Sequence, residues 1–333
     1  MDATNFFDAV SGALDDAEAI ATTQTDASAG TFALRIGSRD PALATDYLRS
    51  FLPASPGRES LPITVLSSRD IDLSRFIPSP RNRGHLRVYD ELTLVWTAGE
   101  HSILYAFDHA ARRGLVWLAN GTAPDWEFSR PACAVINAAA RDSSWTVAHG
   151  AAVGRAGRLL MLAGQGRAGK TTAALACVRA GWDYAGDDYI FADSSNADIL
   201  PLYSSARLRD DMTGSFSELV SRTLRNVSHD CGEIKHELDL SRTVGPERIR
   251  GGRIAAILLP RRQGATQVSF TPARPTDVFQ ALFTTTSFSA PGPMRNYAEK
   301  LTALAARAPS YFVDTGHAPD AIPEAFERFM ESL

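Results

Sequence analysis

One short run of residues combines the types and the spacing that binding a phosphate chain requires. In order it reads Gly164, Gln165, Gly166, Arg167, Ala168, Gly169, Lys170 and Thr171, which matches the pattern G-x-x-x-x-G-K-[ST]. Its glycines let backbone N–H groups approach a phosphate, Lys170 can reach β- and γ-phosphates, and the Thr171 hydroxyl can ligate Mg²⁺. An apolar strand expected at 159–163 precedes the run, and a helix expected at 171–180, with Thr172 in its first turn, brings a positive dipole end to the same point. The sequence therefore predicts a nucleotide-phosphate site at 164–172, with a chance match in a glycine-rich loop as the alternative.

Two adjacent carboxylates, Asp187 and Asp188, follow the expected helix after a short link at 181–183. A strand returning directly beside the first strand would deliver both next to Lys170 and Mg²⁺. One carboxylate can hold the metal, directly or through water, and the other can accept a proton from an attacking hydroxyl. We assign Asp188, with Thr171, to the metal, although the pattern leaves open which aspartate is the base. A solvated turn carrying two acids is the alternative.

A histidine lies at the end of the strand expected before the phosphate loop. His149 belongs to a strand predicted at 146–153, which a turn at 154–157 connects to the strand at 158–163. If the two strands pair, His149 lies near the end of the sheet, opposite or beside the loop. The alternative is a core histidine bonded to a carbonyl group.

Taken together, these residues resemble the HPr kinase/phosphorylase family. The similarity consists of the His149–Gly150 dipeptide, a short hairpin, the phosphate loop, one helix, and an aspartate pair that begins seventeen residues after Lys170. It is closer to the HPr-kinase-related bacterial serine kinases, some of which phosphorylate ribosomally made peptides such as lasso peptides. The specific match covers about residues 147–192, and a wider one could reach the C-terminus.

The resemblance implies a phosphoenolpyruvate-carboxykinase-like P-loop fold, ATP and Mg²⁺, a hydroxyl acceptor, an acidic base at Asp187 or Asp188, and a functional His149 beside that acid. The chain departs from the family pattern at Arg167, where glycine is usual, and at Thr171, where serine is usual. Arg167 either adds a phosphate contact or imposes a different loop shape. The family segment associated with phosphorolysis is not recognisable, so neither phosphorolysis nor HPr as substrate is expected.

Four further cations are candidates for stabilising charge on the transferring phosphoryl group or for contacting the substrate. They are Arg207, Lys235, Arg261 and Arg262. Arg207 is the strongest of them because it is expected at a strand end after the carboxylates. A surface role is the alternative for each.

Composition indicates a folded, cytoplasmic protein of one large or two modest domains. Of the 333 residues, 44% are hydrophobic and 22% charged, and the formal charge of −4 favours neither nucleic acid nor an anionic membrane as partner. Cys133, Cys177 and Cys231 are far apart and have no metal-ligand spacing, which indicates a reducing compartment and no zinc site. No stretch is apolar enough for a membrane span, and the first 16 residues lack the pattern of a secretory signal.

Hydrophobic periodicity predicts an N-terminal α+β domain at 1–143 and an α/β domain at 144–333. The phosphate-binding motif and the family resemblance imply that the second is a P-loop kinase domain. In the first domain we expect helices at 5–20, 41–51 and 130–140, a loop at 22–30, strands at 31–36 and 63–66, an irregular segment at 67–84, and an antiparallel meander at 86–88, 92–97, 102–107 and 114–118. In the second we expect a buried strand at 253–259 and helices at 275–283, 295–307 and 321–332.

The favoured function is transfer of the ATP γ-phosphoryl group to a hydroxyl, most readily a serine of a peptide or protein. A small-metabolite kinase and a non-catalytic nucleotide-dependent binding module remain alternatives. A transport ATPase and a Ras-like GTPase are disfavoured, because no LSGGQ-like and no N-K-x-D segment is found. The sequence leaves the acceptor open, and a homo-oligomer rests on the resemblance alone.

Overall fold

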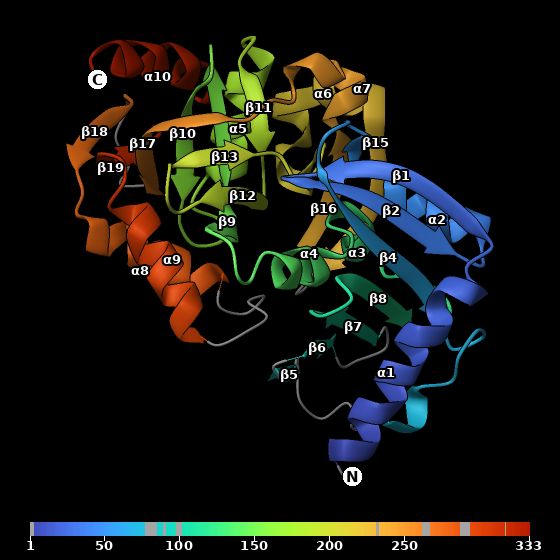
Figure 1. Ribbon diagram of the computed structural model, residues 1–333. Helices are drawn as coiled ribbons and strands as arrows, with labels where there is room; N and C mark the ends of the chain where they lie inside the picture. The colour runs from blue at the N-terminus through green and yellow to red at the C-terminus, as the bar shows by residue number, and fades with distance from the viewer. Residues whose placement is uncertain are drawn as a thin grey trace. The chain divides into compact units, whose positions relative to one another are not determined.

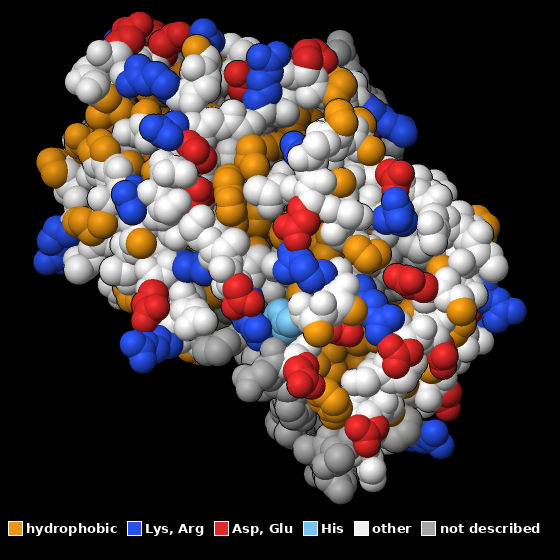
Figure 2. Space-filling model, in the orientation of Figure 1, with side chains coloured by type: hydrophobic (Ala, Val, Ile, Leu, Met, Phe, Trp, Pro, Cys, Tyr) orange, Lys and Arg blue, Asp and Glu red, His pale blue; other side chains and the backbone are white. Residues whose placement is uncertain are grey.

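The computed structural model shows a mixed α/β protein whose residues form two compact units. It describes residues 3–76, 85–88, 91–97, 102–230, 233–261, 267–286, 294–316 and 318–333. The first unit draws its described residues from 3–142, and the second from 143–286 and 294–333. Figure 2 shows Lys and Arg interspersed with Asp and Glu on the face in view, as the small net charge suggests.

The first unit is built on an eight-stranded sheet with the order β3-β1-β2-β4-β8-β7-β6-β5 (Figure 1). Its strands are β1 (Thr23–Ala29), β2 (Phe32–Ser38), β3 (Leu52–Pro53), β4 (Glu59–Ser67), β5 (His85–Val88), β6 (Leu92–Thr97), β7 (Ile103–Asp108) and β8 (Arg113–Leu118). Its helices are α1 (Ala3–Ile20), α2 (Pro41–Leu48), α3 (Asp125–Ser129), α4 (Cys133–Ala139) and the 3₁₀ turn η1 (Ser74–Phe76).

The core of this unit lies between α1 and the sheet. Phe6, Val10 and Leu14 recur at helical spacing and pack against Trp96 and Trp117, which are both almost fully buried. The antiparallel β5–β6–β7–β8 meander is confirmed by the strand register. Part of the irregular segment expected at 67–84 lies outside the described residues.

Two predictions in this unit were wrong. The segment at 22–30 is not a loop, because β1 pairs with β2 from Thr23 to Ala29 and the backbone ladder outweighs its polar, small-residue composition. The helix expected at 130–140 begins at Cys133, because Ala132 adopts a left-handed φ of 53° that no α-helix can include. Pro131 therefore precedes the helix instead of occupying its first turn.

The second unit contains an eight-stranded sheet and a three-stranded sheet. The large sheet comprises β9 (Trp145–Arg155), β10 (Arg158–Ala163), β11 (Asp183–Gly186), β12 (Tyr189–Asp193), β13 (Asp198–Leu200), β17 (Gly252–Arg261), β18 (Ser269–Pro272) and β19 (Ser310–Asp314). The small sheet, with the order β14-β16-β15, comprises β14 (Ser205–Arg209), β15 (Leu224–Asp230) and β16 (Glu233–Asp239). Strand β10 lies between β9 and β17.

Helices cover the large sheet. They are α5 (Lys170–Arg179), α8 (Pro275–Thr286), α9 (Met294–Ala305) and α10 (Ile322–Glu331), and the shorter helical segments are α6 (Ser217–Thr223), α7 (Leu240–Thr243), η2 (Asp210–Phe216), η3 (Pro246–Arg248) and η5 (Pro319–Ala321). Helix α8 packs on α9, and α10 packs on α5. Residues 159–163 of β10 are all buried, as expected for a strand covered on both faces. The strand at 253–259 and the last three predicted helices are confirmed within a few residues at each end.

Candidate functional site

The residues of the phosphate-loop pattern follow directly after a β-hairpin. Strands β9 and β10 pair from Arg155–Arg158 to Gly150–Ala163, and the two turn residues, Ala156 and Gly157, both have positive φ, as in a type I′ turn. This turn keeps the two strands in register. The buried end of β10 therefore delivers Gly164 at a defined point of the sheet.

The loop ends where α5 begins, at Lys170. The first N–H that is bonded to a carbonyl in helical fashion is that of Ala173, which donates to the Gly169 oxygen at 3.0 Å. Helix geometry leaves the earlier N–H groups of Lys170, Thr171 and Thr172 without an intrahelical acceptor, and no side chain caps this end. Donors and a positive dipole end therefore meet at the loop, as the sequence predicted.

Lys170 folds back onto its own loop. Its Nζ donates to the carbonyl oxygens of Gly164 at 2.7 Å and Gln165 at 3.1 Å, and the residue is only 6% exposed. Burial lowers the pKa of Lys170, and the nearby Asp187 and Asp188 carboxylates oppose that shift. The ammonium is thus held beside the loop by weak neutral acceptors.

Asp187 contacts the first turn of α5. The Thr171 hydroxyl donates to its carboxylate, 2.9 Å from Oδ1 and 3.0 Å from Oδ2, and the Arg207 backbone N–H donates to Oδ2 at 3.4 Å. Burial, followed by the charge of Asp188, raises the pKa of Asp187 to about 6. Asp187, rather than the Asp188 assigned from the sequence, is therefore the carboxylate that accompanies Thr171.

The route by which the aspartates reach the loop also differs from the prediction. The returning strand β11 pairs with β9 and not with β10, so β9 separates it from the strand that carries the loop. The register shifts between Tyr184 and Gly186, and the pairing ends with Gly186 opposite Ala152. The pair of aspartates then lies in the connection between β11 and β12, beside the N-terminus of α5.

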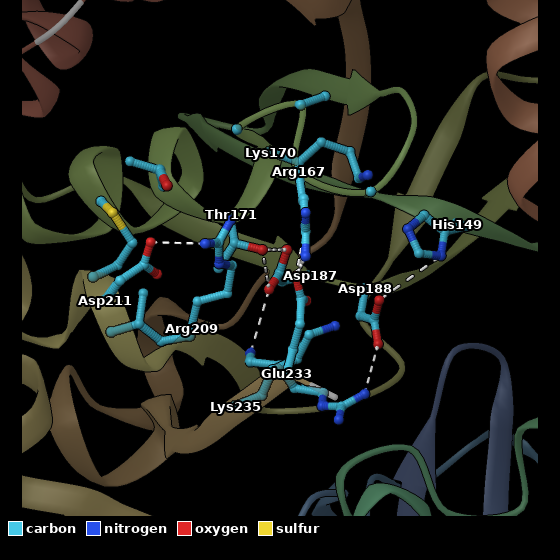
Figure 3. Close-up of a pocket in the computed structure, with 17 residues that line it drawn as sticks. His149, Arg167, Lys170, Thr171, Asp187, Asp188, Arg209, Asp211, Glu233 and Lys235 are labelled. Atoms are coloured by element: carbon cyan, nitrogen blue, oxygen red, sulfur yellow. Dashed lines mark hydrogen bonds and ion pairs between the residues drawn. The ribbon is translucent and has the colours of Figure 1, made fainter. Parts of the chain in front are cut away.

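Asp188 turns away from its neighbour toward a histidine and an arginine. Its φ is +64°, a left-handed conformation that is unusual for a residue with a side chain. One carboxylate oxygen lies 3.7 Å from His149 Nδ1 and the other lies 3.6 Å from Arg207 Nη1. Figure 3 shows His149 facing Asp188 across this gap. The backbone conformation thus separates two adjacent carboxylates into different environments.

His149 and Arg207 are held by the strands that carry them. His149 stands opposite Tyr189 in the β9–β12 register, and its backbone N–H donates to Thr286 Oγ1 at 3.1 Å. Arg207 is 7% exposed and lies in the middle of β14, not at a strand end as expected.

These side chains line one pocket of about 480 Å³. Its lining includes His149, Gly166, Arg167, Ala168, Gly169, Lys170, Thr171, Thr172, Asp187, Asp188, Arg207 and Lys235, all singled out from the sequence. Gly164 and Gln165 adjoin it through the carbonyls that hold Lys170. Arg261 is not in this lining; its guanidinium packs over Phe312 and donates to Thr271 Oγ1. Arg262 lies outside the described residues.

Sequence reasoning missed five residues of the pocket, namely Leu208, Arg209, Asp211, Met212 and Glu233. They come from β14, η2 and β16, and of these elements only a strand ending at Arg207 was expected. The alternation of Arg207 and Arg209 on one strand was the available signal, because residues two apart share a face. The residues that lie opposite them in the small sheet could not be predicted from the sequence, because the opposing strand lies almost thirty residues further along the chain.

The residues around Thr171 fit a magnesium ion that also binds substrate phosphates. A hydroxyl and a carboxylate, from Thr171 and Asp187, are the hard oxygen donors that Mg²⁺ takes when phosphates and water fill its other positions. Within the described parts of the chain, no group of three or more His, Cys, Asp or Glu side chains is placed to hold a metal alone. The donor set therefore suits a metal brought by a phosphate ligand and not a closed protein site.

Comparison with known proteins adds no assignment: no protein-family model and no curated protein matches the chain. Among the described helices, none combines the length and apolarity needed to cross a membrane.

Proposed function

We propose that this protein is a P-loop kinase with a phosphoenolpyruvate-carboxykinase-like nucleotide-binding domain, related to the HPr-kinase-like serine kinases and acting in the cytoplasm. One observation carries the proposal. Thr171 and Asp187 are hydrogen-bonded at the N-terminus of α5, while Asp188, His149 and Arg207 form a separate polar group in the same pocket. A phosphate-binding module needs only the first group, whereas a phosphotransferase needs both.

The nucleotide phosphates would occupy the loop. The N–H groups of residues 170–172 lie in the first turn of α5 and have no acceptor within the helix. Lys170 can exchange the carbonyl oxygens of Gly164 and Gln165 for charged phosphate oxygens. A phosphate oxygen adds the attraction of opposite charges to a hydrogen bond from the ammonium, which a neutral carbonyl oxygen does not. The present contacts of Lys170 are therefore readily replaced.

Thr171 and Asp187 would hold Mg²⁺, directly or through water. When bound, the ion neutralises charge on the β- and γ-phosphates and orients them. Because Asp187 has a pKa of about 6 in the protein without ligands, it is largely ionised at neutral pH, and a nearby cation would complete its ionisation.

Asp188 is the better candidate for the base. Its carboxylate would accept the proton of the acceptor hydroxyl as that oxygen forms a bond to the γ-phosphorus, and the bond from phosphorus to the β,γ-bridging oxygen breaks to release ADP. His149 and Arg207 contact this carboxylate at 3.7 and 3.6 Å and orient it. Arg207 also brings positive charge to the position where charge moves during transfer.

The acceptor we favour is a serine of a peptide or protein, on the strength of the resemblance to HPr-kinase-like serine kinases. The test is incubation of the protein with ATP, Mg²⁺ and candidate acceptors, foremost peptides encoded beside its gene, with Lys170→Ala in parallel. A mass gain of about 80 daltons, one phosphoryl group, on a peptide serine is expected with wild type only. Gain on a small hydroxyl compound instead would identify a metabolite kinase. ATP binding without transfer to any acceptor would indicate a nucleotide-dependent binding module.

A further inference from the structure

An ion pair spans the candidate nucleotide pocket. Arg167, at the tip of the phosphate loop, donates from Nε to Glu233 Oε1 at 2.5 Å, and its Nη2 contacts the same oxygen. Glu233 is the first residue of β16 in the three-stranded sheet, and both residues line the pocket. Figure 3 shows the Arg167 side chain extending from the loop toward Glu233. The pair thus joins the loop to the opposite wall.

The backbone conformation of Arg167 does not explain why an arginine stands there. Its φ of +66° lies in the left-handed region, which glycine adopts freely and a residue with a side chain adopts only with strain. An arginine at this position is therefore disfavoured locally. Its side chain has a polar partner in Glu233.

The ion pair between Arg167 and Glu233 contributes little to the stability of the protein. The Arg167 side chain is 69% exposed, and exposed ion pairs stabilise proteins little because water and salt screen them. A polyphosphate would offer the guanidinium a stronger and bidentate acceptor a short distance away along the same loop. Competition between the two acceptors therefore favours the phosphate.

A second cation lies near Glu233 and remains there when Arg167 binds a phosphate instead. Lys235 is two residues further along β16, on the same face of the strand, and also lines the pocket. The hydrogen bond from Arg167 lowers the pKa of Glu233 most, and the charges of Lys235 and Arg209 lower it further. The positive charge of Lys235 therefore still acts on the carboxylate after the exchange.

We propose that Arg167 is a second cation for the nucleotide phosphates, and that Glu233 holds it across the pocket until a polyphosphate replaces the carboxylate. The inference rests on the proposed nucleotide site and adds a residue and a competing anion to it. Nucleotide entry then breaks the link between the loop and β16.

The test is the dissociation constant for ATP and for inorganic tripolyphosphate, with Mg²⁺, measured by calorimetry. Glu233→Gln removes the competing charge and should tighten binding about three- to tenfold, whereas Arg167→Gln should weaken it by a similar factor.

The control is Asp198→Asn. Asp198 pairs with Arg253, a side chain also 69% exposed, near the other end of β17 from the loop. That variant makes the same change of net charge and should bind within about twofold of wild type.

Two double variants distinguish the proposed replacement of Glu233 by a phosphate from two simpler explanations, namely charge repulsion alone and a purely structural ion pair. If Glu233→Gln tightens binding equally in the Arg167→Gln background, the carboxylate acts by repulsion alone and the exchange is wrong. The charge swap R167E/E233R restores an ion pair but removes the cation from the loop, so we expect binding at least tenfold weaker than wild type. A swap that binds like wild type would show that the pair is only structural.

The outcome for wild type separates the two proposals. If wild type binds neither ligand, the nucleotide site itself is wrong and Arg167 has no role in it. If wild type binds ATP, Lys170→Ala does not, and Glu233→Gln matches wild type, the proposed function survives and the exchange alone is overturned.

Discussion

The adjacent residues Asp187 and Asp188 differ in what surrounds them, and that difference assigns their proposed roles. Asp187 is buried against Thr171, whereas Asp188 has a left-handed backbone and faces His149 and Arg207. Neighbours in sequence can act differently only if the backbone separates their side chains. Here a single φ of +64° at Asp188 accompanies that separation.

Substitution at each aspartate should therefore have different effects. Asp188→Asn removes the proposed base but leaves the loop and Thr171 intact, so transfer should fall by about 10²–10⁴-fold while ATP still binds. Asp187→Asn removes the proposed metal ligand, so the Mg²⁺-dependent part of ATP affinity should be lost. Calorimetric titration with and without Mg²⁺, beside a phosphoryl-transfer assay, measures both effects. Full turnover by both variants would exclude the mechanism.

The raised pKa of Asp187 also predicts a pH-dependent stability. Between its ordinary value of 3.8 and its value of about 6, the folded protein binds more protons than the unfolded chain. The free energy of unfolding should therefore fall as pH rises through this window, by up to about 3 kcal/mol. Asp187→Asn cannot titrate, so it should be more stable than wild type at pH 7.5, with a smaller advantage at pH 4. Urea unfolding at both pH values measures the difference.

Asp193 provides a control with the opposite sign. It is also buried, but hydrogen bonds from Ser195 and Asn196 outweigh the effect of its burial and lower the pKa of Asp193 below its ordinary value. Its contribution to stability is present above pH 3.8 and is lost as pH falls through the lowered pKa. Asp193→Asn should therefore destabilise the protein at pH 7.5. A stabilised Asp193→Asn would show that the pH argument does not apply to this sheet.

At the scale of elements, β9 organises the site. It pairs with β10, which carries the loop, and with β11 and β12, which flank the aspartates, and it also carries His149. The hairpin, the loop and α5 were predicted because their periodicity and turn residues are local. The pairing of β11 with β9 was not, since every strand of a covered sheet is apolar and its neighbours are set by packing.

The close packing around β9 can be tested at Gly154. A Cβ at this position would lie 1.9 Å from the Arg158 carbonyl oxygen, so Gly154→Ala must displace the hairpin backbone. We expect a loss of about 3 kcal/mol or more, or failure of the second unit to fold. Gly157→Ala, in the turn of the same hairpin, is the matched control, because a Cβ there meets nothing within 4 Å and only the φ of +76° is strained. It should cost about 1–2 kcal/mol in chemical unfolding, and equal losses for the two variants would contradict this account.

At the scale of the whole molecule, every residue lining the pocket belongs to the second unit. A fragment of residues 143–333 should therefore bind ATP with an affinity within a few-fold of the full chain, provided that circular dichroism shows it folded. A folded fragment that binds no ATP would show that the first unit completes the nucleotide site. Transfer to a peptide by the fragment would show, in addition, that the first unit is not needed for the acceptor.

The sequence by itself determined the features that depend on short stretches of chain. The loop at 164–169 between a buried strand and a helix, and the hairpin before it, follow from residue spacing, and amphipathic periodicity located most of the described helices. Tertiary structure decided which aspartate meets Thr171, that Arg207 and Lys235 reach the pocket while Arg261 does not, and that Glu233 faces Arg167. The physical reason is that backbone hydrogen bonds between strands distant in sequence, and the left-handed turns at Arg167 and Asp188, are set by packing of the whole unit.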